Sequence, residues 1–217
     1  MTSVILVGAT GLVGRHVLER ALADKRIIRV VAPTRRPLPG HAKLVNPLVD
    51  FESLPEDADW WSVDGAVCAL GTTRAKAGLA TMAYARAIRT VDHDYPLAVA
   101  RLVRSRGAAR FALTSTMAAD ARSRFLYTRT KGELEERLKD LHFLSLTLVR
   151  PGLIGGQRNE ARAAERIAGA ILGTLAPLLP RRFRISPAGR IAEVLTDAAV
   201  EGPPGCQIVE AGSLAEP

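Results

Sequence analysis

The glycine-rich turn at residues 8–14 constrains this chain more than any other stretch. An apolar run from Val4 to Val7 leads into glycines at positions 8, 11 and 14. Four consecutive aliphatic residues are typical of a buried parallel strand, and the apolar residues after the turn recur at helical spacing. The stretch therefore predicts a strand, a tight turn and a helix.

Each glycine of this turn has a distinct steric reason to be glycine. Gly8 lets the chain turn, Gly11 leaves room for a pyrophosphate, and Gly14 lets the helix lie close to the strand. The helix N-terminus adds free N–H groups and a partial positive charge that attract phosphate. A turn with only a structural role is the alternative. We predict dinucleotide contacts from Gly8, Thr10, Gly11, Leu12, Val13 and Gly14.

The end of the second predicted strand, residues 27–32, indicates which dinucleotide binds. Proteins that bind NAD usually carry an acidic residue about 20 positions after the glycine turn, where it holds the ribose 2′-hydroxyl. Here the chain instead has Thr34, Arg35 and Arg36. Guanidinium groups bind a 2′-phosphate through paired hydrogen bonds, so Arg35 and Arg36 favour NADPH over NADH. The alternative is a solvated arginine pair.

Strands and helices alternate along the whole chain, which predicts an α/β fold of the Rossmann type. Its doubly wound parallel sheet would lie between two helical layers, with a small C-terminal extension. We predict further strands at 43–49, 65–70, 109–115 and 143–149, an edge strand at 206–209, and helices at 79–106 (with a kink at Pro96), 127–141, 161–175 and 189–201. Residues 150–156 are expected to form a flexible loop and residues 177–187 an irregular segment.

The length of 217 residues fits one domain, 1–217, in which residues 151–205 would include a small lid on the substrate side. No apolar stretch approaches the roughly 20 residues that span a membrane, and no signal peptide precedes the first strand, so we expect a cytoplasmic protein. Cys68 and Cys206 are expected to be small buried hydrophobic residues in strands, and no metal site is predicted.

The net charge of +8 raises the possibility of nucleic-acid binding. The basic residues are dispersed, only 5% of the residues are aromatic, and no nucleic-acid-binding motif is present. Solvated basic faces are the better explanation, so no nucleic-acid partner is predicted.

Polar and small residues follow two further strands at the edge where such sheets bind ligands. Asp50 and Phe51 end the third predicted strand and would meet an adenine edge and ring face. The fourth strand ends in a segment expected to approach the cofactor, namely Leu70, Gly71, Thr72 and Thr73.

Tyr127 and Lys131 stand one turn apart at the start of a predicted helix, and Ser115 ends the strand before it. A neighbouring ammonium and a nicotinamide cation would lower the pKa of the phenol from about 10 and make it useful as an acid or base. Tyr127 would then exchange a proton with a substrate, Lys131 would also hold the nicotinamide ribose, and Ser115 would hydrogen-bond the substrate oxygen. Thr116 is the alternative for this last role.

These motifs together resemble the atypical short-chain dehydrogenase/reductases, and more closely the Tat-interacting-protein oxidoreductases and their bacterial epimerase-like relatives. The resemblance implies a Rossmann fold, NADPH in the crevice, a Ser115–Tyr127–Lys131 set, and the backbone near Pro151 and Gly152 facing the carboxamide. The segments that carry it are the glycine turn and residues 70–78, 91–95, 125–133 and 150–152.

Two functions remain open from the sequence. The first is an NADPH-dependent oxidoreductase acting on a small carbonyl or alcohol that the sequence does not identify. The second is an NADPH-binding redox sensor or protein-interaction module without turnover. Epimerase chemistry is not expected, because the chain lacks the sizeable C-terminal substrate domain of sugar-nucleotide epimerases. A homodimer or a protein partner is compatible with either function.

Overall fold

A computed structural model describes residues 1–72, 81–155 and 180–215, and it shows a parallel sheet of seven strands in the order β3-β2-β1-β4-β5-β6-β9. Neighbouring strands run parallel throughout, which confirms the predicted fold class. The strands are β1 (Thr2–Val7), β2 (Ile27–Val31), β3 (Leu44–Val45), β4 (Gly65–Cys68), β5 (Arg110–Thr114), β6 (Ser145–Arg150) and β9 (Gly205–Glu210).

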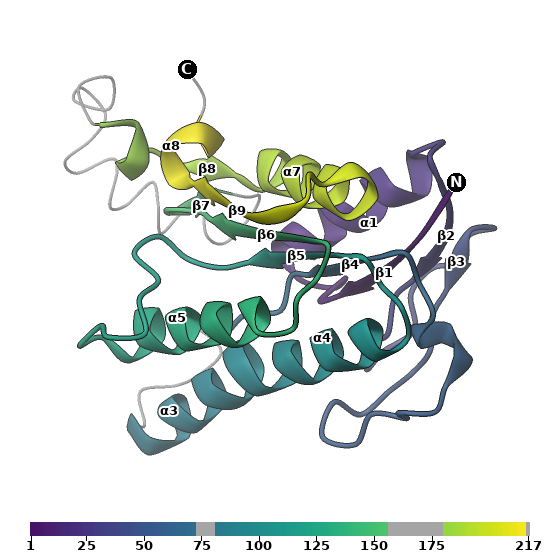
Figure 1. Ribbon diagram of the computed structural model, residues 1–217, viewed down its shortest axis with the longest axis horizontal. Helices are drawn as coiled ribbons and strands as arrows, with labels where there is room; N and C mark the ends of the chain where they lie inside the picture. The colour runs from purple at the N-terminus through teal and green to yellow at the C-terminus, as the bar shows by residue number, and fades with distance from the viewer. Residues whose placement is uncertain (73–80, 156–179, 216–217) are drawn as a thin grey trace.

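Helices cover both faces of this sheet and form a three-layer structure (Figure 1). On one face, α1 (Leu12–Ala23) and α7 (Ala188–Glu201) bury Val17 and Ile191. On the other, α4 (Tyr95–Ser105) and α5 (Leu126–Lys139) bury Val99 and Leu134 around the fully buried Trp61 of the short helix η1 (Asp59–Trp61). Because all strands are parallel, their carboxyl ends meet at one edge, where ligands of such folds bind.

The predicted helix at 79–106 is continuous from residue 81 to residue 105 but contains a π-helical turn. It consists of α3 (Thr81–Arg89), η2 (Thr90–Asp94) and α4. The N–H of Tyr95 donates to the carbonyl of Thr90, five residues back. Pro96 has no N–H to give the carbonyl of Asp92, which explains why the regular bonding pattern changes here. The predicted kink is therefore a π turn, and it buries Asp92 and His93.

Several strands are shorter than predicted, and the third and fourth affect the site. The third covers only Leu44–Val45, since Pro47 cannot donate to a ladder; a bridge from Thr34 to Leu48 then continues the pairing. The fourth ends at Cys68, which leaves residues 69–72 as an irregular segment at the carboxyl edge.

The segment after β6 is more ordered than predicted. Instead of a flexible loop, β7 (Ile154–Gly155) pairs in parallel with β8 (Ser186–Pro187) and forms a second small sheet. The segment at 177–187, predicted to be irregular, contains β8 and the short helix η4 (Arg181–Phe183). The helix predicted at 161–175 lies outside the described residues.

The C-terminal part contributes to the main fold. The predicted helix and edge strand are confirmed as α7 and β9, and a short helix, α8 (Ala211–Leu214), follows them. Within the range 151–205, for which a lid was predicted, α7 packs in the core beside α1. Cys68 is buried as predicted, but Cys206 is exposed because it lies on the edge strand. No helix in the described residues is long and apolar enough to cross a membrane.

Substitution of Gly14 tests how closely α1 packs against the glycine turn at residues 8–14. A Cβ at Gly14 would lie 2.0 Å from the carbonyl oxygen of Gly8, so Gly14→Ala is expected to lower the free energy of unfolding by about 1–3 kcal/mol. The control is Gly189→Ala in α7, where a Cβ meets nothing within 4 Å. Urea unfolding should separate the two variants, and equal stabilities would contradict the steric argument.

Candidate active site

The glycine turn has the steric properties that the sequence predicted. Gly8 has a φ of 90°, and a Cβ there would lie 2.6 Å from the carbonyl carbon of Ala69. Gly11 is the N-cap of α1, which has no side-chain cap bond and no acidic residue in its first turn. The first N–H groups of the helix therefore keep their capacity to bind an anion.

Arg35 and Arg36 extend from the carboxyl end of β2 with both side chains exposed. In the described part of the chain, neither guanidinium forms an ion pair with a carboxylate. Thr34 is buried; its hydroxyl donates to the carbonyl of Arg36 at 2.6 Å and accepts from Asn46 at 2.8 Å. Thr34 thus fixes the loop, and Arg35 and Arg36 stay exposed beside it.

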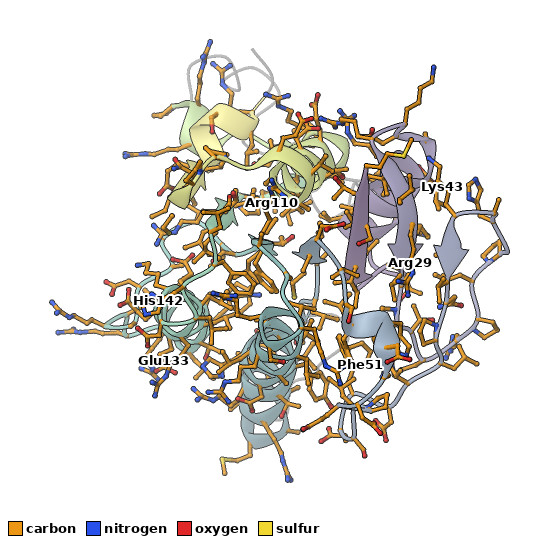
Figure 2. All side chains as sticks on the ribbon, turned by 45° about the vertical axis from the view of Figure 1, so that its right-hand side comes forward. Arg29, Lys43, Phe51, Arg110, Glu133 and His142 are labelled. Atoms are coloured by element: carbon orange, nitrogen blue, oxygen red, sulfur yellow. The ribbon has the colours of Figure 1, made fainter. Side chains whose placement is uncertain are left out.

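Phe51, which Figure 2 labels, forms an aromatic pair with Tyr95; the centroids of the two rings lie 5.6 Å apart. The hydroxyl of Tyr95 donates to Glu52, and burial together with that bond raises the pKa of Tyr95 to about 12. Asp50 is exposed and accepts the N–H of Glu52 at 3.0 Å. The predicted adenine contacts, Asp50 and Phe51, thus lie in the loop that follows β3.

The segment after β4 is held by Asp92. The N–H of Thr72 donates to Asp92 Oδ2 at 3.0 Å, and a Cβ at Gly71 would lie 3.5 Å from Asp92 Oδ1. Leu70 packs against the core. The buried hydroxyl of Thr72 finds no hydrogen-bond partner in the described residues. Thr73, the last of the predicted contacts in this segment, lies outside the described residues.

Lys131 is the most deeply buried charged residue of the predicted set, with 1% of its surface exposed. Its Nζ lies 3.1 Å from Oδ1 of Asp92, which is 0% exposed, and donates to the carbonyl of Thr114 at 3.3 Å. The sequence reasoning missed Asp92 as a site residue. The sequence feature that could have identified Asp92 is Pro96, because this proline forces the π turn that places Asp92 in the interior.

Tyr127 lies one turn before Lys131 on α5 and is half-buried. Burial raises its pKa; Lys131 acts to lower it, while Asp92 and Tyr84 add to the rise. The predicted effect of Lys131 is thus present but outweighed. For Lys131, burial acts to lower the pKa, but the negative charge of Asp92 and the neighbouring Tyr127 raise it overall.

Ser115 belongs to a separate buried network. Its hydroxyl donates to Glu135 Oε1 at 2.5 Å, and Arg150 binds the same carboxylate through two bonds of 3.0 and 2.5 Å. Arg150 also reaches Glu210 at 3.2 Å, and hydrogen bonding to Glu135 raises the pKa of Arg150. Glu135, one turn beyond Lys131, was missed because nothing in the sequence paired it with Ser115. The Ser115 hydroxyl, which was predicted to hydrogen-bond a substrate oxygen, thus already has a partner within the protein.

Pro151 and Gly152 lie after β6 at the same edge. The carbonyl of Pro151 accepts the N–H of Met117 at 2.8 Å, and the N–H of Gly152 donates to the Ser186 hydroxyl at 3.3 Å. Both backbone groups thus already form hydrogen bonds within the protein. A nicotinamide carboxamide at this position would have to bind other backbone groups of the segment.

No family model matches the chain, but individual proteins do. The mitochondrial protein fmp52 of Emericella nidulans is 36% identical over 184 residues, which cover 81% of this chain and 76% of the fungal protein. HTATIP2 of Rattus norvegicus is 36% identical over 178 residues, covering 80% and 71%. The expectation of a cytoplasmic protein is contradicted by this comparison, because several fungal relatives are named as mitochondrial.

Solved structures of low identity share the fold. A short-chain dehydrogenase/reductase from Brucella melitensis superposes with a TM-score of 0.73 at 16% identity, covering 99% of this chain and 97% of that one. MoeE5, solved with UDP-glucuronic acid and NAD, superposes with a TM-score of 0.71 at 18% identity, covering 95% and 75%.

Proposed function

Because the chain belongs to the atypical short-chain dehydrogenase/reductase family of the fmp52 and HTATIP2 proteins, with its NAD(P)-binding Rossmann fold, we propose that it is an NADPH-dependent oxidoreductase acting on a small carbonyl or alcohol. The observation that carries this proposal is the pairing of half-buried Tyr127 with fully buried Lys131 at the carboxyl edge of the sheet. The glycine turn lies at the same edge.

The described residues fit a nicotinamide dinucleotide. Gly11 begins a helix with no side-chain cap and no acidic residue in its first turn, which suits a pyrophosphate. Arg35 and Arg36 would bind the 2′-phosphate, and Phe51 would lie against the adenine. The hydroxyl of Thr72, which has no hydrogen-bond partner within the described ranges, would face the crevice. MoeE5 binds NAD on the same fold, which supports a cofactor of this class.

The bound cofactor would supply a hydride to the carbonyl carbon. Tyr127 would donate its phenolic proton to the carbonyl oxygen in the same step, or accept one when an alcohol is oxidised. Lys131 would support the resulting phenolate and hold the ribose hydroxyls. We assign the hydrogen bond to the substrate oxygen to Thr116, because the Ser115 proton is directed to Glu135 and the half-exposed Thr116 follows it in the chain.

The second candidate, an NADPH-binding module without turnover, is favoured by one observation. Two polar groups of the predicted Ser115–Tyr127–Lys131 set have partners within the protein: Ser115 binds Glu135, and Lys131 binds Asp92. A catalytic site needs Tyr127 to reach a substrate, whereas a sensor needs only the cofactor contacts. The Tyr127 variant in the Discussion separates these two functions.

Cofactor choice tests the proposal. NADPH should bind more tightly than NADH, and Arg35→Ala and Arg36→Ala should each weaken NADPH binding about tenfold or more while leaving NADH binding nearly unchanged. The reason is that each variant removes a charge-assisted hydrogen bond worth roughly 1.5–3 kcal/mol. Isothermal titration calorimetry with both nucleotides measures this.

The control is Arg137→Ala. Arg137 is an exposed arginine in the last turn of α5, far along that helix from Tyr127, and its loss should leave both affinities unchanged. Equal affinity of the wild type for NADPH and NADH would refute the assignment of Arg35 and Arg36.

A further inference from the structure

Asp92 joins three parts of the site. It comes from the π turn, one carboxylate oxygen lies 3.1 Å from the ammonium of Lys131 on α5, and the other accepts the N–H of Thr72 after β4. Both charged side chains are almost completely buried, at 0% and 1% exposed. Asp92 therefore contacts both Lys131 of the predicted proton-transfer pair and the predicted cofactor segment.

A lysine buried this deeply needs a counter-charge to keep its proton. Burial disfavours the charged form, and an isolated buried lysine can lose its proton near neutral pH. Among the described residues, the groups that face Lys131 are Asp92 from η2, Tyr127 from its own helix, Cys68 from β4 and the carbonyl of Thr114 from β5. Asp92 is the only carboxylate among these four groups, and its Oδ1 lies 3.1 Å from the Lys131 ammonium.

We propose that Asp92 is a positioning residue whose buried carboxylate keeps Lys131 in its ammonium form and holds it beside Tyr127. The carboxylate also fixes the backbone at Thr72, so the ammonium and the segment after β4 stay in one arrangement. The ammonium is the form that would donate to the ribose and support a phenolate. That consequence for the cofactor rests on the proposed function, whereas the protonation of Lys131 can be tested without it.

The first test uses stability and needs no cofactor. In Asp92→Asn, burial should depress the pKa of Lys131 in the folded protein below its unfolded value of about 10.4, so the unfolded state binds more protons between these two values. Stability of Asp92→Asn should then rise with pH from about 7 to about 10, by up to about tenfold in the folding equilibrium constant per pH unit. Urea unfolding across this range measures the effect.

The matched control is Asp92→Asn/Lys131→Met, which lacks the titrating group and should not show that rise. If the difference between the two variants stays flat with pH, Lys131 remains charged without Asp92 and the proposal is wrong. Should Asp92→Asn be unfolded at neutral pH, its native circular dichroism should return near pH 10. Failure to return, with the double variant folded at both pH values, would also overturn the proposal.

The second test uses NADPH as the probe. Wild-type affinity should stay constant from about pH 7 to about pH 9.5, whereas Asp92→Asn should lose affinity as pH rises, because Lys131 loses its ammonium donors. Lys131→Met should bind weakly at every pH. Wild type that binds no NADPH would refute the proposed function and leave the stability test to decide on Asp92; a flat profile for Asp92→Asn with normal affinity would refute the role of Asp92.

Discussion

Tyr127→Phe is expected to lower turnover by roughly 10²–10⁴ while leaving NADPH affinity nearly unchanged. The substitution keeps the half-buried ring and removes only the hydroxyl, so the site loses its proton donor and no predicted cofactor contact. The phenol carries its proton near neutral pH, as a donor to a carbonyl must, since burial only raises the pKa of Tyr127 above its ordinary value. The measurement is NADPH oxidation with a panel of aldehydes, ketones and quinones.

Tyr84→Phe is the matched control, because Tyr84 lies close enough to influence Tyr127 but has no role in the proposed chemistry. It should keep wild-type turnover. A carbonyl that both wild type and Tyr127→Phe reduce at the same rate would show that Tyr127 is not the proton donor. Tight NADPH binding without turnover of any compound would favour the binding module, and a search for protein partners with and without NADPH would follow.

Lys131→Met is expected to weaken cofactor binding and to lower the free energy of unfolding by about 3–5 kcal/mol. The ammonium is buried against Asp92, so its removal leaves a buried carboxylate without its counter-charge. Turnover should fall as well, because the phenolate of Tyr127 loses its support. Urea unfolding and NADPH titration measure the two effects on the same sample.

The double variant Lys131→Met/Asp92→Asn separates these effects. It removes both charges of the buried pair, so much of the lost stability should return while cofactor binding stays weak. If the single variant Lys131→Met is as stable as the wild type, the buried ion pair does not contribute in the way the 3.1 Å contact implies.

The sequence by itself determined the features that depend on local spacing. The three glycines between a strand and a helix predicted the turn. The structure confirms its geometry, because Gly8 has a positive φ and Gly14 approaches the carbonyl of Gly8 closely. The alternation of strands and helices predicted the parallel sheet. Tyr127 and Lys131 could be paired because residues four apart share a helix face.

Only the tertiary structure decided how charges pair in the interior. Asp92 forms an ion pair with Lys131 from another helix, and Glu135 accepts the hydrogen bond of the Ser115 hydroxyl. Neither pairing can be read from spacing, because each joins elements that the sheet brings together. The same reason explains why Cys206 is exposed: the order of strands, and not its apolar surroundings in the sequence, places it at the edge of the sheet. Sequence spacing thus identified the groups that could act, whereas the fold determined which of them already have partners in the protein.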